Sequence, residues 1–396
     1  MNNIGTPVPY WRLSGFYFFY FAFLGALIPY WGLYLETQGF DAVSIGQLTA
    51  IVLFTKVVSP LLWSWVSRRT SSNGSVSKMS IVRIGALVTL IFLTGLCFQP
   101  SFWPLAACIF GFSFFRNAIL PEMEAITLGF VSSALHQYAR IRLWGSVGFI
   151  LLVVILGVVF DYFPLSLLPL ILLLLGLFIW ISTLLVANRE TTAQLDVSVQ
   201  SFWLVLKRPQ VIAFLSVAFL MQLAHGPYYT FYTIHLNALG YEKFTIGIMW
   251  SVGVLAEVVL FYQMHKLLAV CTAKQIFIGS ILLSALRWFM IGKFADSLLL
   301  LFLAQLLHAA SYASFHAICV QYIHKHFSGH LEGQGQALYV SASFGLGGAL
   351  GAIYVGHAWE TMGAATSFIL ASLFCLLAAL IALKGVNFES KYNQAG

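Results

Sequence analysis

The chain has 396 residues, of which 60% are hydrophobic and only 8% are charged. Average soluble domains carry roughly 25% charged residues, so this composition excludes a soluble enzyme, a disordered chain and a nucleic-acid-binding domain. It also argues against an outer-membrane barrel, whose strands alternate apolar and polar residues. The sequence therefore predicts an all-α membrane protein, with the lipid bilayer as its surroundings and no nucleic acid as a partner.

Apolar stretches of membrane-spanning length recur along the whole chain. A transmembrane helix needs about 20 predominantly apolar residues. Twelve such stretches are predicted, at 9–35, 43–66, 80–98, 103–131, 142–160, 163–186, 210–236, 244–264, 275–292, 297–322, 334–358 and 363–384. An even number of spans places both termini on one side of the membrane.

The charges between the spans indicate which side that is. Cytoplasmic loops of membrane proteins carry an excess of Lys and Arg. If the termini are cytoplasmic, 15 of the 20 Lys and Arg lie on or near that side. Three lie inside predicted spans, and two, Lys243 and Lys293, lie in outer loops. The outer loops carry acids instead, namely Glu36, Asp41, Asp161, Glu242, Asp296 and Glu360. This sorting predicts twelve spans with both termini in the cytoplasm.

The longest polar stretch divides the chain into equal parts. Residues 187–209 are predicted to form a cytoplasmic linker between a six-helix bundle at 1–186 and a second at 210–396. Two such halves are typical of transporters built from repeats, with the substrate site at the interface of the repeats. The expected architecture is therefore twelve transmembrane helices in two six-helix bundles.

Six charged residues lie inside predicted spans, and Arg142 lies at the inner end of span five. A charge at a helix centre costs about 2.5–3.5 kcal/mol on insertion scales, and such residues usually face a polar cavity or pair with each other. They indicate a substrate path, a proton relay, or ion pairs that only fix helix packing. The six are Lys56, Arg116, Glu122, Glu124, Glu257 and Arg287. The sequence assigns no role to Lys56, Arg116 or Glu122.

Two sets of His and Tyr residues share helix faces, because residues three and four apart lie on one side of a helix. One set is His308, Ser311 and Tyr312, and the other is His225, Tyr228 and Tyr229. A histidine in a span can relay a proton or bind substrate, since its pKa lies near neutral pH. Both sets are equally compatible with helix packing.

Searches for enzyme motifs give no match. The sequence lacks HExxH, GxSxG and Walker A patterns, and no set of side chains has convincing metal-ligand spacing. We expect neither enzymatic activity, nor a bound metal, nor a cofactor. Transport would then be driven by an ion gradient or be passive.

Several segments resemble the major facilitator superfamily, and within it the phenylpropionate permease group and, more distantly, the lactose permeases. The resemblance covers the whole chain. The matching segments are FYFFYFAFLGALIPYWGLYL in span one, PEMEA in span four, RIRLWGSVGF in span five, AHGPYY in span seven, SVGVLAEVVLF in span eight and LRWFMIG in span nine. The resemblance implies the major facilitator fold and transport activity.

The resemblance also implies roles for individual residues. PEMEA and RIRLWG place Glu124 and Arg142 where lactose permeases hold the sugar, while Arg287 and His308 match residues near the proton site. The proton-carrying glutamate of lactose permeases falls on Ser311, which cannot serve, so Glu257 is its expected substitute. The predicted proton-coupling residues are therefore Glu257, Arg287 and His308. The predicted substrate-binding residues are Glu124, Arg142, His225, Tyr228, Tyr229, Ser311 and Tyr312.

Together these features predict a secondary active transporter that takes up a small organic substrate with protons. An aromatic carboxylic acid is the first expectation; a sugar or a nucleoside is the alternative, and a membrane sensor that does not transport is a further one. The expected partners are the substrate and the proton, the expected location is a bacterial cytoplasmic membrane, and the expected state is a monomer.

Overall fold

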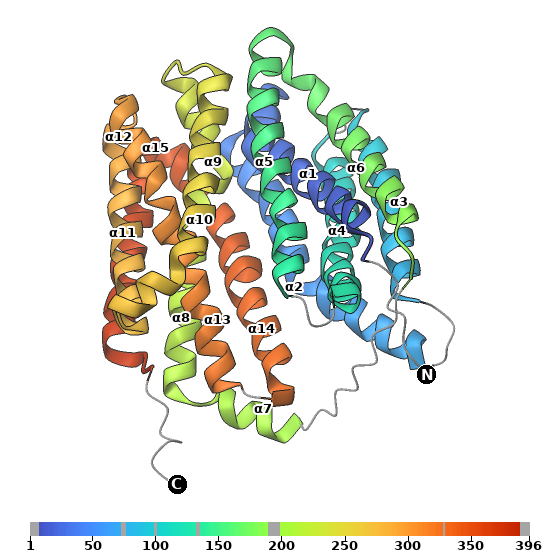
Figure 1. Cartoon of the computed structure of the whole chain (residues 1–396). Helices are drawn as coiled ribbons and strands as arrows, with labels where there is room; N and C mark the ends of the chain where they lie inside the picture. The colour runs from blue at the N-terminus through green and yellow to red at the C-terminus, as the bar shows by residue number, and fades with distance from the viewer. Residues whose placement is uncertain are drawn as a thin grey trace. The chain divides into compact units, whose positions relative to one another are not determined.

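A computed structural model describes residues 8–72, 77–98, 101–131, 135–188, 199–327 and 329–388. Within these ranges every regular element is a helix (Figure 1). The contacts divide the chain into two compact units, one of residues 1–31 with 58–193, the other of 32–57 with 194–396. The predicted limits of the two six-helix bundles, at residues 186 and 210, remain a prediction, because these compact units are defined by contacts alone.

The first unit is built from the helices that follow one another up to residue 185. They are α1 (Tyr10–Thr37) and α2 (Ala42–Ser72), of which each contributes one part to this unit, then α3 (Lys78–Leu96), α4 (Phe102–Val131), α5 (Leu135–Tyr162), the 3₁₀ turn η1 (Leu165–Leu167) and α6 (Leu168–Leu185). Helix α1 lies against α5, where a Cβ on Gly148 would collide with the Phe18 carbonyl oxygen. Glycine at this position allows the two backbones to approach closely.

The second unit holds the remaining helices. They are α7 (Val199–Leu206), α8 (Pro209–Ala224), α9 (Gly226–Ala238), α10 (Lys243–Val270), α11 (Ala273–Phe294), α12 (Leu298–Leu306), the π-helix η2 (Ala309–Ser314), α13 (Phe315–His326), the 3₁₀ turn η3 (Gly329–Leu331), α14 (Glu332–Val340), the π-helix η4 (Ser341–Gly347) and α15 (Gly348–Gly385). Helix α15 packs against α8, α9 and α11. The last part of α1, from Gly32 on, and the first part of α2, up to Val57, belong to this unit.

Three predicted spans differ in detail from straight helices. The span at 210–236 is interrupted at His225, because Pro227 lacks an N–H and cannot complete the helical hydrogen bond to residue 223. The spans at 297–322 and 334–358 each contain a π-helical segment. These segments shift the faces that the following helices present, which a pattern of apolar residues does not encode.

The described ranges contain eleven helical stretches long and apolar enough to cross a membrane. The last of them, Glu332–Gly385, has 54 residues, which is about 80 Å of helix and more than twice a bilayer core. Gly363 interrupts it with a φ of 80°, a conformation that L side chains rarely adopt. This stretch therefore supplies two spans, in agreement with the predicted twelve.

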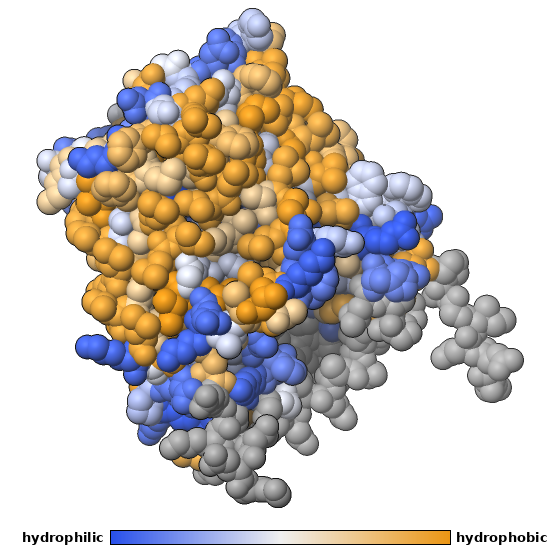
Figure 2. All heavy atoms as spheres, turned by 60° about the vertical axis from the view of Figure 1, so that its left-hand side comes forward, coloured by the Kyte–Doolittle hydropathy of each residue, from blue (hydrophilic) through white to orange (hydrophobic). Residues whose placement is uncertain are grey.

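The surface of the helices suits a lipid environment. Large apolar side chains are exposed along most of them, including Phe110, Leu151, Leu174, Val259 and Leu376, each with more than 40% of its surface exposed. On the face shown in Figure 2, apolar side chains cover most of the area and hydrophilic ones gather towards its edges. The chain is therefore a multi-pass membrane protein.

Candidate functional site

A buried polar cluster in the second unit centres on Arg287 of α11. Its Nη1 donates to His308 Nδ1 at 2.7 Å and to Ser311 Oγ at 3.0 Å, and its Nη2 donates to Gln305 Oε1 at 3.2 Å. Arg287 has no exposed surface. His308 and Ser311 share one helix face, as their spacing predicts, and the guanidinium ties that face to α11.

Glu257 of α10 joins the cluster through the His308 ring nitrogen that does not face Arg287. Its Oε1 lies 2.5 Å from His308 Nε2, and 15% of the Glu257 side chain is exposed. Arginine can only donate hydrogen bonds, so His308 Nδ1 must accept one. A neutral His308 then carries its proton on Nε2, and this N–H donates a hydrogen bond to the Glu257 carboxylate. The three predicted proton-coupling residues thus form one hydrogen-bonded line.

Aromatic side chains surround the Arg287 guanidinium. Its Cζ lies 4.2 Å from the ring centre of Tyr228 and 4.4 Å from that of Trp288, within the range of cation–π attraction. The Tyr228 hydroxyl donates to Gln305 Oε1 at 3.2 Å, and Gln305 Nε2 donates to the hydroxyl of Tyr232. These neighbours fix the positions of the Arg287 guanidinium and the Gln305 amide.

The helix that carries His308 is irregular at that point. His308 is followed directly by the π-helix η2, Ala309–Ser314. Single π-helical turns within α-helices are frequent at functional sites. The Tyr312 ring stacks on the His308 ring with centroids 5.9 Å apart. Tyr312 therefore packs on the hydrogen-bonded line.

His225 and Tyr229 lie beside this cluster rather than in its hydrogen-bonded line. His225 has no exposed surface, and its Nδ1 lies 2.6 Å from the Met221 carbonyl oxygen. Its ring stacks on Tyr229, with centroids 5.6 Å apart, and meets Trp288 edge-on. Of the three residues predicted on this face, Tyr228 alone contacts Arg287 in the described contacts.

A second polar cluster lies in the first unit. Arg142 Nε is 3.5 Å from Glu124 Oε1, and about one third of each side chain is exposed. The Arg142 guanidinium also lies over the ring of Phe21, with Cζ 4.1 Å from its centre. Tyr138 interacts with both members of the pair. The predicted partners Glu124 and Arg142 are therefore neighbours.

Sequence reasoning missed Gln305 and Tyr232. Gln305 could have been found, because it is a polar residue three positions before His308 and so shares its helix face. Tyr232 likewise lies four residues after Tyr228.

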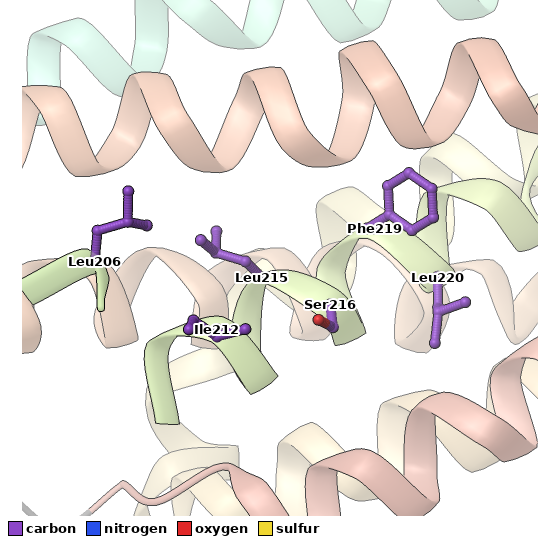
Figure 3. Close-up of a pocket in the computed structure, with 6 residues that line it drawn as sticks. All are labelled: Leu206, Ile212, Leu215, Ser216, Phe219 and Leu220. Atoms are coloured by element: carbon purple, nitrogen blue, oxygen red, sulfur yellow. The ribbon is translucent and has the colours of Figure 1, made fainter. Parts of the chain in front are cut away.

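A shallow hollow lies along α7 and α8 (Figure 3). It is lined by Leu206, Ile212, Leu215, Ser216, Phe219 and Leu220. Its lining includes no ionisable side chain, so it is a poor candidate for binding a charged substrate. Among the residues that the structure describes, no three His, Cys, Asp or Glu side chains are grouped so that they could hold a metal ion.

Comparisons with known proteins identify the class. The chain is 27% identical to the "Probable 3-phenylpropionic acid transporter" of Escherichia coli (strain K12), over 91% of this chain and 94% of the relative. It is 25% identical to the "Putative nucleoside transporter YegT" of the same organism, over 82% and 78%. The crystal structure of the nucleoside transporter NupG superposes with a TM-score of 0.82 at 17% identity, over 94% of this chain and 98% of that one.

The fold and these relatives define a membrane transporter of the major facilitator type, not an enzyme. The model of the MFS_1 like family matches residues 10–370, so the chain belongs to that family. The fold predicted from the sequence is therefore confirmed, as is the predicted kinship with phenylpropionate transporters.

Proposed function

We propose that the protein is a proton-coupled symporter that takes up a small organic acid by alternating access. The observation that supports proton coupling is the buried line Glu257–His308–Arg287, with an Nε2–Oε1 distance of 2.5 Å and an Nη1–Nδ1 distance of 2.7 Å. Ionisable residues held within a membrane span are typical of proton pathways. In this proposal the line binds and releases the coupled proton.

Glu257 is the group in this line that can take a proton without breaking it. A proton added to His308 would place an N–H against the Arg287 guanidinium and abolish the bond at Nδ1. A proton added to Glu257 leaves the other carboxyl oxygen free to accept from His308 Nε2. Glu257 is also the more exposed of the two side chains, at 15% against 5%. His308 is then a positioning residue for Glu257.

The proposed substrate class is an aromatic carboxylic acid. It is supported by the 27% identity, over nearly the full length of both chains, to a protein named as a phenylpropionic acid transporter. Glu124 and Arg142 line the proposed substrate site in the first unit, where Arg142 attracts the carboxylate of the acid and Glu124 pairs with Arg142. A nucleoside is the alternative, supported by the 25% identical relative, and a sugar held jointly by Glu124 and Arg142 is a further one.

The same proposal includes the cellular setting. Bacterial relatives and the distribution of Lys and Arg support a location in a bacterial cytoplasmic membrane with both termini inside. Residues 1–186 and 210–396 would form the two alternating halves, joined by the linker at 187–209. A monomer would suffice, because each half supplies one of the two polar clusters.

Uptake into proteoliposomes tests this function. Vesicles that are acidic outside should accumulate 3-phenylpropionate faster than the same vesicles with a protonophore, and faster than protein-free vesicles, which correct for diffusion of the neutral acid. Uridine and lactose, tested in parallel, distinguish the alternatives. Uptake that is equally fast with and without the pH gradient would contradict proton coupling. A lack of protein-dependent uptake of all three compounds would contradict the proposed substrates.

A further inference from the structure

Arg116 is a buried cation that the proposed mechanism does not yet use. It lies in the middle of α4, and only 2% of its surface is exposed. Its Cζ is 5.3 Å from the ring centre of Tyr20 and 5.3 Å from that of Phe23, and both rings are buried. Two aromatic rings of α1 therefore flank the guanidinium.

The polar contacts of Arg116 are few for a buried guanidinium. A guanidinium has five N–H donors. Nη2 makes one long contact with Asn117 Oδ1, at 3.4 Å, and neither Nε nor Nη1 has a hydrogen-bond partner among the described residues. Within the same ranges no carboxylate forms an ion pair with it. Buried charges are normally paired, so this site has unused capacity for an anion.

The charges around Tyr20 strengthen this conclusion. Tyr20 lies within electrostatic range of Arg116, Glu124 and Arg142. Glu124 is already engaged by Arg142, at 3.5 Å. Two cations and one anion leave this cluster with a net positive charge, and the excess resides on the arginine that has no anionic partner among the described residues. About one third of each side chain in the pair Glu124–Arg142 is exposed, so the cluster is accessible at this pair.

We propose that Arg116 binds the carboxylate of the transported substrate, and that the flanking rings of Tyr20 and Phe23 pack on its aromatic part. A carboxylate accepts hydrogen bonds from a guanidinium in a geometry that suits both groups. The substrate class is thereby narrowed to aromatic monoanions. This inference rests on the proposed transport function and adds a binding residue that sequence reasoning left without a role.

Binding of a matched pair of probes to the purified protein tests the proposal. The probes are 3-phenylpropionate and 3-phenylpropanamide, which share the ring and chain and differ in charge. The unaltered protein should bind the acid at least about tenfold more tightly than the amide, as expected for a charge-assisted bond. Arg116→Met should remove this preference and leave the affinity for the amide unchanged. Arg116→Lys should retain part of it, and Arg140→Met, at an exposed arginine of α5, should retain all of it.

Thermal stability without ligand separates a binding role from a structural one. Arg116→Met removes a cation for which the described residues supply no anionic partner, so the melting temperature of the unliganded protein should stay the same or rise. A marked fall, with equal loss of both probes, would show that Arg116 is structural and would overturn the proposal. An acid preference that survives in Arg116→Met would also overturn it. The proposed transport function fails separately, by a lack of gradient-driven uptake in the unaltered protein.

Discussion

Arg287 and Arg116 occupy similar surroundings in the two units but differ in their polar partners. Both are buried within spans, and each guanidinium carbon lies within 5.3 Å of two aromatic ring centres. Arg287 donates to three side chains, and only its Nε lacks a partner among the described residues; Arg116 has one long contact there. A cation held by several hydrogen bonds to fixed side chains is a permanent part of its site, whereas one with a single long contact has capacity for a ligand.

In the proposed mechanism this difference gives the two units complementary tasks. The second unit holds the line of groups that can exchange a proton, and the first unit holds the excess positive charge that can attract a substrate anion. In the proposed symport, proton and substrate therefore bind in different units. The following substitutions test this division of roles.

The largest effect is expected for Glu257→Gln. The amide cannot take up a proton, so accumulation driven by a pH gradient should be abolished, while exchange of labelled for unlabelled substrate across the membrane continues. Uptake and exchange in proteoliposomes measure the two quantities. Glu242→Gln, at an exposed glutamate just before the same helix, is the matched control and should behave as the unaltered protein. Accumulation against a gradient by Glu257→Gln would disprove the proton assignment.

Arg287→Met should lower stability, in contrast to Arg116→Met. The substitution leaves His308 Nδ1 without its donor, which costs about 1–3 kcal/mol for a buried acceptor. Thermal unfolding of the two variants, purified under the same conditions, measures the contrast. Equal melting temperatures for the two variants would mean that their different hydrogen bonding has no energetic consequence, and the comparison would lose its basis.

Glu124→Gln should have a smaller effect, and its sign distinguishes the substrate classes. It removes the acid beside Arg142 and raises the net positive charge around Tyr20, so an aromatic acid should bind more tightly. The gain should be about two- to fivefold, because the pair is one third exposed and solvent weakens it. Binding of 3-phenylpropionate at low ionic strength measures it, with 3-phenylpropanamide as the control. Weaker binding of the acid would favour a direct contact with Glu124, as in the sugar alternative.

Gly253→Ala is expected to have the smallest effect. Its Cβ would lie 3.0 Å from His308 Cδ2, so His308 must shift by a few tenths of an ångström. A 1 Å misplacement can cost about 100-fold, so this shift should slow gradient-driven uptake about two- to fourfold. Gly279→Ala in α11 is the control, because no described atom lies within 4 Å of its Cβ position. Equal uptake rates for the two variants would show that the geometry of His308 is not critical.

Much of the fold could be predicted from the sequence because the length of an apolar run is a local property. The runs gave the spans, and Gly363 marks where one 54-residue helical stretch becomes two. The interruption at His225 was also signalled locally, by Pro227. The π-helices at Ala309–Ser314 and Ser341–Gly347 had no such signal, since they depend on how the helices pack.

The candidate sites divide in the same way. That Glu257, Arg287 and Arg116 lie within spans could be predicted from the sequence, because a charge among apolar residues is visible without a structure. The hydrogen bonds from Arg287 to His308 and from His308 to Glu257 became visible only in the folded structure, as did the lack of an anion beside Arg116 among the described residues. Hydrogen bonds between helices depend on which faces meet, and residues 21 positions apart, such as Arg287 and His308, leave no trace of that meeting in their spacing.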